Sequence, residues 1–358
     1  MAPSLEFALA LECCRFASMR GDACRPTLGA DVDWPLFLRL VRFHRIQGLA
    51  WHALAEMRAE IPDEVAGALA DDAAEIAAAN LRSAIECRGI LADFDENEMP
   101  VLFLKGLTMG ALAYGNASIK VGIDIDLLVA EDHCAQAARL LEGRGYELLY
   151  PGWSATPERL SSWHRRHKES VWRRPAERLH LDLHTRLSDN RALLPSLDVR
   201  SPCQSVAVAA GVALPTLATD ELFAYLCVHG ASSAWFRLKW IADFAGFLHG
   251  RSGEELDRLY RRSQDLGAGR AAGQALLLAH ALFQSLEQNL ALRESLELDR
   301  ANRWLCNSAL RQLAIGTEPS EPTERFLGTA KIHLTQFALL PGLGFKLSEL
   351  ARQARIRG

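Results

Sequence analysis

The first hundred residues show the three- and four-residue spacing of apolar positions that is typical of amphipathic helices. Helical patterning runs from Leu5 to about Glu98. One segment, WPLFLRLVRFHRIQGLAWHALAEM, follows Asp33, which suits an N-cap, and carries Pro35 at an early helix position. A further helix or helix pair is expected through DEVAGALADDAAEIAAANLRSAIECRGILADF. This part of the chain is predicted to be all-helical.

The pattern changes at Pro100, where short apolar runs alternate with helical segments. VLFL (101–104) and IDIDLLV (123–129) are each too short for a helix and read as buried strands. LTMGALAY and EDHCAQAARLLEGRGY read as helices. YELLY, KESVWRR (168–174) and LHLDLHTRL (179–187) complete the strands, the last two as a hairpin. These segments predict a mixed sheet of four or five strands between Pro100 and Asn190.

Beyond Pro202 we expect helices to the end of the chain, with no internal repeat. The predicted fold class is α+β, with a small mixed β-sheet core flanked by helical regions. The predicted domains are a helical N-terminal region (1–98), an α/β core (99–190) and a helical C-terminal region (191–358). A chain of 358 residues favours two or three packed units over one.

Charge and cysteine content restrict the classes of protein. A formal net charge of −4 with 23% charged residues excludes a general nucleic-acid binder, so any anion site must be local. The eight cysteines contain no CxxC pair and are interpreted as reduced thiols. The N-terminus does not resemble a signal peptide, and the most apolar window, Ala271 to Leu286, is too short and too polar to span a bilayer. We therefore expect a cytoplasmic protein without a membrane partner.

Two aspartates in the most apolar predicted strand are the leading site candidates. Strand alternation puts Asp124 and Asp126 on one face, where they would repel each other without a cation. A solvated strand face is the alternative, but aspartate is disfavoured in strands. Carboxylate ligands of this kind suit Mg²⁺ or Mn²⁺.

A second group of polar residues lies in LHLDLH. Alternation puts His180, Asp182 and His184 on the face opposite the leucines, so Asp182 is a candidate third carboxylate on a neighbouring strand. His180 is more simply a surface residue, and His184 is equally well a hydrogen-bonding partner that orients a neighbour.

A strand-to-helix turn forms the third candidate. Lys105 and Gly106 directly follow the VLFL strand, and a glycine turn at a helix start lets backbone N–H groups approach a phosphate. A Lys-Gly pair alone is a weak signal, and its position gives it weight.

In order along the chain, LKG (104–106), DIDLLV (124–129) and DLH (182–184) resemble the motifs of the polymerase-β-type nucleotidyltransferase superfamily, and in detail a bacterial group of uncharacterised nucleotidyltransferases. The resemblance implies that Asp124, Asp126 and Asp182 are catalytic and hold the metal. His184 would orient them by hydrogen bonding without binding the substrate itself. Lys105, Gly106 and Lys120 would bind the nucleotide phosphates.

The implied reaction transfers a nucleoside monophosphate from an NTP, ATP by default, to an unidentified small molecule, sugar, peptide or protein, with Mg²⁺ or Mn²⁺ as cofactor. Two departures from the group's pattern matter. Lys120 stands where the group usually has arginine, which loses bidentate phosphate geometry, and no serine follows Gly106. A non-catalytic nucleotide-binding or scaffold protein with the same fold therefore remains the alternative.

A zinc hydrolase built on His180, Asp182 and His184, with His164 or His167, is a second alternative. Alternate side chains on one strand lie about 6–7 Å apart, which makes convergence on a tetrahedral ion difficult.

Two further features carry charge. Seven cationic side chains lie between Arg159 and Arg178, either as a solvated hairpin or as an electropositive rim that attracts a triphosphate or an acidic acceptor. Lys239 and Asp243 are spaced to pair on one helix, most simply as interdomain packing.

Overall fold

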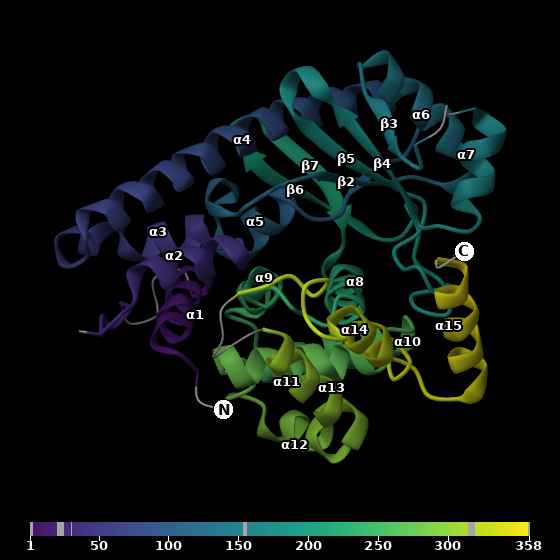
Figure 1. Cartoon of the computed structure of the whole chain (residues 1–358). Helices are drawn as coiled ribbons and strands as arrows, with labels where there is room; N and C mark the ends of the chain where they lie inside the picture. The colour runs from purple at the N-terminus through teal and green to yellow at the C-terminus, as the bar shows by residue number, and fades with distance from the viewer. Residues whose placement is uncertain (1–2, 20–24, 30, 153–155, 314–318, 357–358) are drawn as a thin grey trace.

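A five-stranded mixed sheet lies at the top of the molecule, and helices from both ends of the chain surround it (Figure 1). The computed structural model describes residues 3–19, 25–29, 31–152, 156–313 and 319–356. The predicted α+β class is confirmed. No described helix has the length and apolar character needed to cross a membrane.

The sheet has the strand order β1-β2-β5-β4-β3. Its strands are β1 (Leu102–Phe103), β2 (Ile125–Leu128), β3 (Glu147–Tyr150), β4 (Glu169–Arg174) and β5 (Leu179–His184). β2 pairs in parallel with β5, whereas the other neighbours are antiparallel. In the β2–β5 register Asp126 lies opposite Asp182, and Leu128 lies opposite His184.

The predicted strand IDIDLLV (123–129) is shorter than expected. β2 begins at Ile125, so Asp124 lies just before the strand rather than within it. The expected strand alternation therefore does not determine where the Asp124 side chain points. The β4–β5 hairpin forms as predicted, and Leu181 and Leu183 are buried as expected from the alternation.

Helices of the central part pack on the sheet and bury a hydrophobic cluster that includes Phe94, Leu127, Leu141 and Trp172. These helices are α4 (Asp63–Glu96), α5 (Leu107–Tyr114), α6 (Cys134–Gly143) and α7 (Pro157–His164). The long helix α4 extends from the N-terminal helices across the sheet-bearing part (Figure 1).

The N-terminal helices are α1 (Leu5–Ser18), α2 (Trp34–Phe43) and α3 (Gln47–Leu54). The expected N-cap is confirmed, since the Asp33 carboxylate accepts a hydrogen bond from the backbone N–H of Leu36 at 2.9 Å. A second hydrophobic cluster joins these helices to the C-terminal ones, for example Phe7 and Phe37 with Phe244 and Leu276.

The expectation of helices directly after Pro202 is wrong. A two-stranded hairpin comes first, formed by β6 (Cys203–Ala209) and β7 (Val212–Leu217), and Val212 and Leu214 belong to the hydrophobic cluster of the sheet. The alternation of buried and exposed residues in β7 was hidden by Pro215. The helices that follow are α8 (Thr219–Ser232), α9 (Leu238–Leu248), α10 (Gly253–Asp265), α11 (Arg270–Phe283), α12 (Leu290–Leu298), α13 (Arg300–Gln312), α14 (Gly328–Gln336) and α15 (Leu343–Ile356).

Candidate functional site

The parallel pairing of β2 and β5 brings together three side chains that can bind a metal. Asp126, Asp182 and His184 each offer one ligand atom, and these atoms lie within 4.8 Å of one another. Two of the three, Asp126 and Asp182, are direct cross-strand neighbours. The predicted convergence of DIDLLV and DLH is therefore present, with His184 in the group.

Asp126 is the most strongly held carboxylate of the group. Its side chain is 2% exposed, and its Oδ1 lies 2.8 Å from Lys105 Nζ and 3.1 Å from His184 Nε2. Burial alone would raise the pKa of Asp126, but Lys105 and His184 outweigh it and hold the pKa far below its usual value. Lys105 thus supplies part of the cationic charge that the sequence required beside these aspartates.

His184 lies between two carboxylates. Its Nε2 faces Asp126, and its Nδ1 lies 3.2 Å from Glu169 Oε2 on the adjacent strand β4. Glu169 in turn pairs with Lys168 at 2.6 Å, and although burial opposes it, the nearby positive charge lowers the pKa of Glu169 to about 2. Of these two contacts the one between Nε2 and Asp126 is a hydrogen bond, and it orients the imidazole ring.

Asp182 has the opposite electrostatic character. Burial, together with the charges of Asp126, Asp124 and Glu169, raises the pKa of Asp182 to about 8. It has no ion-pair partner among the described residues. A bound cation would relieve this repulsion, which is the condition expected of a metal ligand.

Gly106 gives the turn after β1 an unusual backbone conformation. Gly106 precedes α5 with φ +64°, a left-handed conformation that disfavours a side chain. Gly106 lines the cavity described below, so the start of α5 borders that cavity.

Lys120 is held by a loop that α4 fixes in place. Asn80 Nδ2 donates to the carbonyls of Ala117 at 2.9 Å and Lys120 at 2.8 Å. Lys120 Nζ lies 3.3 Å from Asp243 Oδ2, and Tyr114 donates its hydroxyl to Asp243 Oδ1 at 2.8 Å. The expected pairing of Asp243 with Lys239 is thus replaced by a pairing with Lys120.

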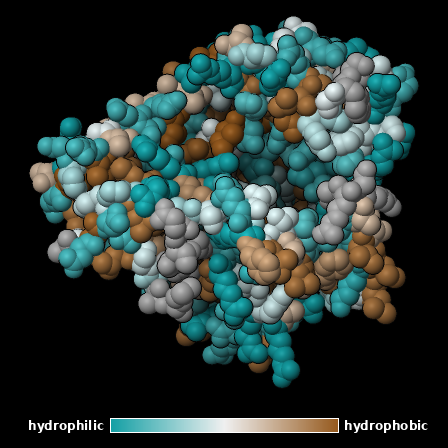
Figure 2. Space-filling view, viewed as in Figure 1, coloured by the Kyte–Doolittle hydropathy of each residue, from teal (hydrophilic) through white to brown (hydrophobic). Residues whose placement is uncertain are grey.

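One cavity of about 200 Å³ connects these elements. It lies between the sheet and helices α8 and α9, where Figure 2 shows a hollow rimmed largely by hydrophilic residues. Its charged lining residues are Arg45, Lys105, Lys120, Asp124, Asp126, Lys168, Glu169, Asp182, Lys239 and Asp243.

Six of these charges cancel in the pairs Lys105–Asp126, Lys120–Asp243 and Lys168–Glu169. The other four have no ion-pair partner among the described residues: the carboxylates Asp124 and Asp182 and the cations Arg45 and Lys239. Burial and the neighbouring Lys120 lower the pKa of Lys239 to about 7. The cavity therefore contains unpaired acidic and basic groups together.

Sequence reasoning missed Arg45, Glu169 and Lys239 as site residues. Arg45 lies between two helices with φ +57°, an unusual backbone conformation that the helical pattern of its segment does not reveal. In the sequence Glu169 is one of several charged residues in the stretch 159–178. Only its position opposite His184 in the β4–β5 register marks it as a site residue.

The histidines of the zinc-hydrolase alternative do not assemble. His180 is exposed, and His167 stacks on Trp163 with ring centroids 3.6 Å apart. His164 is buried between Thr185 Oγ1 and Ser170 Oγ, each at 3.1 Å. Among the described residues, only His184 of these histidines joins the carboxylates.

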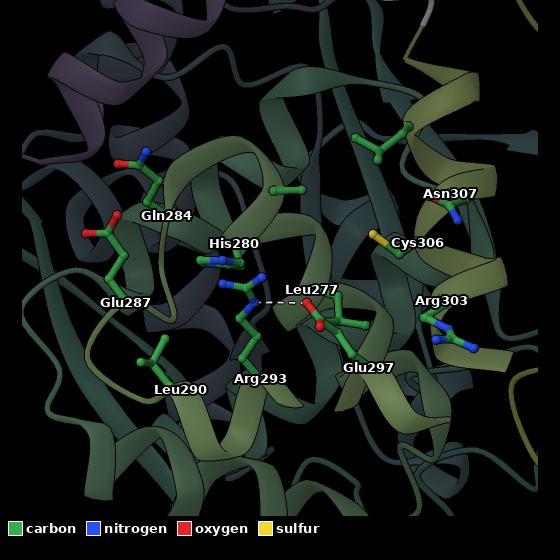
Figure 3. Close-up of a pocket in the computed structure, with 12 residues that line it drawn as sticks. Leu277, His280, Gln284, Glu287, Leu290, Arg293, Glu297, Arg303, Cys306 and Asn307 are labelled. Carbon is green, nitrogen blue, oxygen red and sulfur yellow. Dashed lines mark hydrogen bonds and ion pairs between the residues drawn. The ribbon is translucent and has the colours of Figure 1, made fainter. Parts of the chain in front are cut away.

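A larger cavity of about 730 Å³ lies apart from this chemistry, among helices α11, α12 and α13 (Figure 3). Its charged side chains include Arg293 and Glu297, which pair with each other at 2.9 Å. It includes none of the motif residues, so we assign the site to the smaller cavity.

Comparison with known proteins agrees with the geometry. No curated protein matches the chain. A family model described as uncharacterised nucleotidyltransferase matches residues 30–284, which includes the turn at Lys105, both aspartate-bearing strands and helix α9. The chain therefore belongs to the family of uncharacterised nucleotidyltransferases.

Proposed function

We propose that the protein is a metal-dependent nucleotidyltransferase that moves a nucleoside monophosphate from an NTP to an acceptor, with pyrophosphate as the second product. One observation carries this proposal. The same cavity holds unpaired carboxylates, which attract a cation, and unpaired cations, which attract an anion. A metal complex of a triphosphate has both features in one ligand.

The donor set fits a divalent cation. Asp126 and Asp182 offer carboxylate oxygens and His184 a ring nitrogen, and Asp124 lines the same cavity. We propose Asp124, Asp126 and Asp182 as the metal-binding and catalytic residues, with His184 as their positioning partner or a fourth ligand. Mg²⁺ or Mn²⁺ at this position would neutralise phosphate charge and lower the pKa of the acceptor hydroxyl.

The triphosphate would lie along the cationic part of the cavity. Lys105 and Gly106 stand at the turn before α5, and Lys120 stands opposite on the loop held by Asn80. Because Lys105 and Lys120 already have carboxylate partners, we add Arg45 and Lys239 as the phosphate-binding cations. ATP is the default donor.

The transfer needs no covalent enzyme intermediate. The acceptor hydroxyl oxygen forms a bond to the α-phosphorus, and the bond from that phosphorus to the oxygen bridging to the β-phosphate breaks. Pyrophosphate leaves, and the hydroxyl proton is released to solvent. The chain's contribution is to position the reactants and to compensate the phosphate charge.

A cytoplasmic location is part of the proposal. The seven cysteines among the described residues are free thiols, which fits a reducing compartment. Cys24 lies outside the described residues.

A non-catalytic nucleotide-binding protein is the second candidate. The observation that favours it is Lys120, which stands in place of arginine and forms an ion pair with Asp243. Nucleotide binding without pyrophosphate release would support this candidate.

A thermal-shift screen of the four NTPs with Mg²⁺ or Mn²⁺ tests the proposal. An NTP present at about 100 times its dissociation constant should stabilise the protein by roughly 2.7 kcal/mol, and only with the metal. No shift with any NTP and either metal would contradict the proposed function.

A further inference from the structure

Another cavity, in which five of the seven ionisable lining residues are arginines, lies beside the candidate active site. It has a volume of about 470 Å³ and lies between the end of α7, the segment after β5, and α15. In Figure 1, α7 and α15 are on the same side of the molecule, above and below this position. Its ionisable lining residues are Arg165, Arg166, His167, Arg186, Asp189, Arg191 and Arg352.

Only some of the cationic residues in the stretch 159–178 line this cavity. Arg173 pairs with Glu147, and Arg174 pairs with Glu86 and Glu177, so these two have structural partners. Arg165 and Arg166 instead meet arginines from distant parts of the chain, which the sequence pattern alone does not connect.

The positive charge of the cavity is incompletely compensated. Arg352 pairs with Glu349, and Arg191 lies 3.4 Å from Glu131. Arg165, Arg166 and Arg186 have no ion-pair partner among the described residues. Asp189 is the single carboxylate among the residues that line the cavity.

Arg186 shows the deficit most clearly. Its Nη1 donates to the carbonyl of His164, but its buried Nε has no hydrogen-bond partner among the described residues. Burial and the neighbouring Arg191 disfavour the positive charge of Arg186 and lower its pKa. An anion in the cavity would compensate the charge of Arg186.

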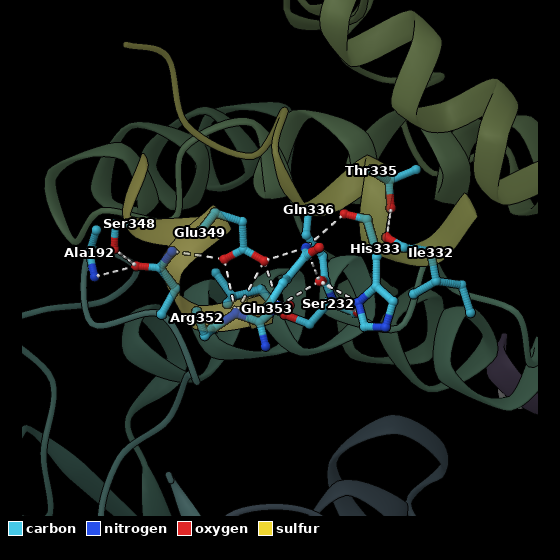
Figure 4. A network of polar contacts seen from close by, with 12 residues as sticks. Ala192, Ser232, Ile332, His333, Thr335, Gln336, Ser348, Glu349, Arg352 and Gln353 are labelled. Carbon is cyan, nitrogen blue, oxygen red and sulfur yellow. Dashed lines mark hydrogen bonds and ion pairs between the residues drawn. The ribbon is translucent and has the colours of Figure 1, made fainter. Parts of the chain in front are cut away.

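Hydrogen bonds hold the side of the cavity that α15 forms. Asn190 donates to Glu349 Oε2 at 2.8 Å, and Arg352 Nη2 donates to Gln336 Oε1 at 2.7 Å (Figure 4). Gln336 Nε2 donates to the carbonyl of Ser232 on α8 at 2.7 Å. This network ties α15 to α14 and α8, so Arg352 is held in position before any ligand binds.

The arginine cavity and the active-site cavity are lined by consecutive residues of the chain. Lys168, which lines the active-site cavity, directly follows His167, which lines the arginine cavity. The two cavities share no lining residue, so Arg45 and Lys239 belong to one cation group and the arginines to another.

We propose that the arginine cavity binds a phosphate group on the acceptor, so the acceptor is a small phosphate-bearing molecule whose hydroxyl reaches toward Asp182. This assignment of substrate class rests on the proposed nucleotidyltransferase function. Guanidinium groups bind phosphate in a bidentate manner, which gives orientation as well as affinity. The phosphate group of the acceptor is held and is not itself altered in the reaction.

Inorganic phosphate is the probe that tests this proposal, by calorimetric titration of the full chain saturated with Mg²⁺ and a non-hydrolysable ATP analogue. The analogue occupies the triphosphate end, so any phosphate that binds occupies a second place. The test variant is Arg165→Gln/Arg166→Gln, since both side chains are exposed and their replacement should leave the fold intact. The matched control is Arg261→Gln/Arg300→Gln, which removes the same charge from exposed positions outside the cavity.

The parent and the control should bind phosphate equally, and the test variant at least tenfold more weakly, while all three bind the analogue alike. The proposed acceptor site is overturned if the parent saturated with Mg²⁺ and the analogue does not bind phosphate. It is also overturned if the test variant binds phosphate as tightly as the parent does. Failure of the parent to bind the analogue with Mg²⁺ instead overturns the proposed function, and the acceptor assignment falls with it.

Discussion

Replacing Asp126 with asparagine should destabilise the metal-free protein, because Asp126 is the buried partner of Lys105. The Asp126 side chain is 2% exposed and that of Lys105 is 19% exposed, at a separation of 2.8 Å. Removing one partner of a buried pair typically costs 3–5 kcal/mol. Asparagine keeps the size of the side chain and one acceptor oxygen, which places the expected loss in the free energy of unfolding at about 3 kcal/mol.

Urea denaturation of the parent and Asp126→Asn at pH 7 in EDTA measures this loss. Asp124→Asn is the matched control, since Asp124 precedes β2, is partly exposed and has no ion-pair partner among the described residues. It should change stability by no more than about 0.5 kcal/mol. If the two variants are equally stable, the Lys105–Asp126 pair does not stabilise the protein, and simple repulsion between the aspartates would be the better account.

The remaining predictions concern the cations and the histidines. Lys105→Ala should lose about 3 kcal/mol of unfolding free energy in EDTA, because Asp126 loses its closest cation, and Mg²⁺ should restore part of it in the same urea titration. Lys239→Gln should weaken NTP binding about tenfold. Because the pKa of Lys239 is about 7, the parent should take up a proton on binding at pH 8, and calorimetry in buffers of different ionisation enthalpy should show that this uptake is absent from the variant. Burial lowers the pKa of His44 and His164 to about 3, so the unfolded chain gains protons that the folded protein does not as the pH falls below 6.5. As the pH falls from 6.5 to 5, each histidine should lower the free energy of unfolding by up to about 1.4 kcal/mol per pH unit. A urea midpoint that rises over this range as the pH falls would contradict this.

The sequence predicted the strands of the site well because their signal is local. The apolar alternation of LHLDLH and the short run VLFL identified β5 and β1, and the order of the motifs identified the family. The parallel register that sets Asp126 against Asp182 joins strands far apart in the chain, so no local pattern specifies it.

The partners of each charged residue were harder to predict. The sequence placed Lys105 at a phosphate and paired Lys239 with Asp243, whereas the structure pairs Lys105 with Asp126 and Lys120 with Asp243. These ion pairs depend on side chains from the turn after β1, from β2, from the loop after α5 and from α9 meeting in three dimensions. The hairpin after Pro202 was missed for a related reason, since its pattern is weak until it packs against the sheet.

Calorimetric titration of an NTP into the parent and into Asp126→Asn/Asp182→Asn, with Mg²⁺ and with EDTA, tests the central claim most directly. The account predicts that the parent binds the NTP with Mg²⁺ and binds it much more weakly in EDTA, and that the double variant loses the dependence on the metal. Because the variant is expected to be less stable, its folded state is first verified by circular dichroism. Metal-independent binding by the parent, or metal-dependent binding retained by a folded double variant, would contradict the assignment of the site to these two strands.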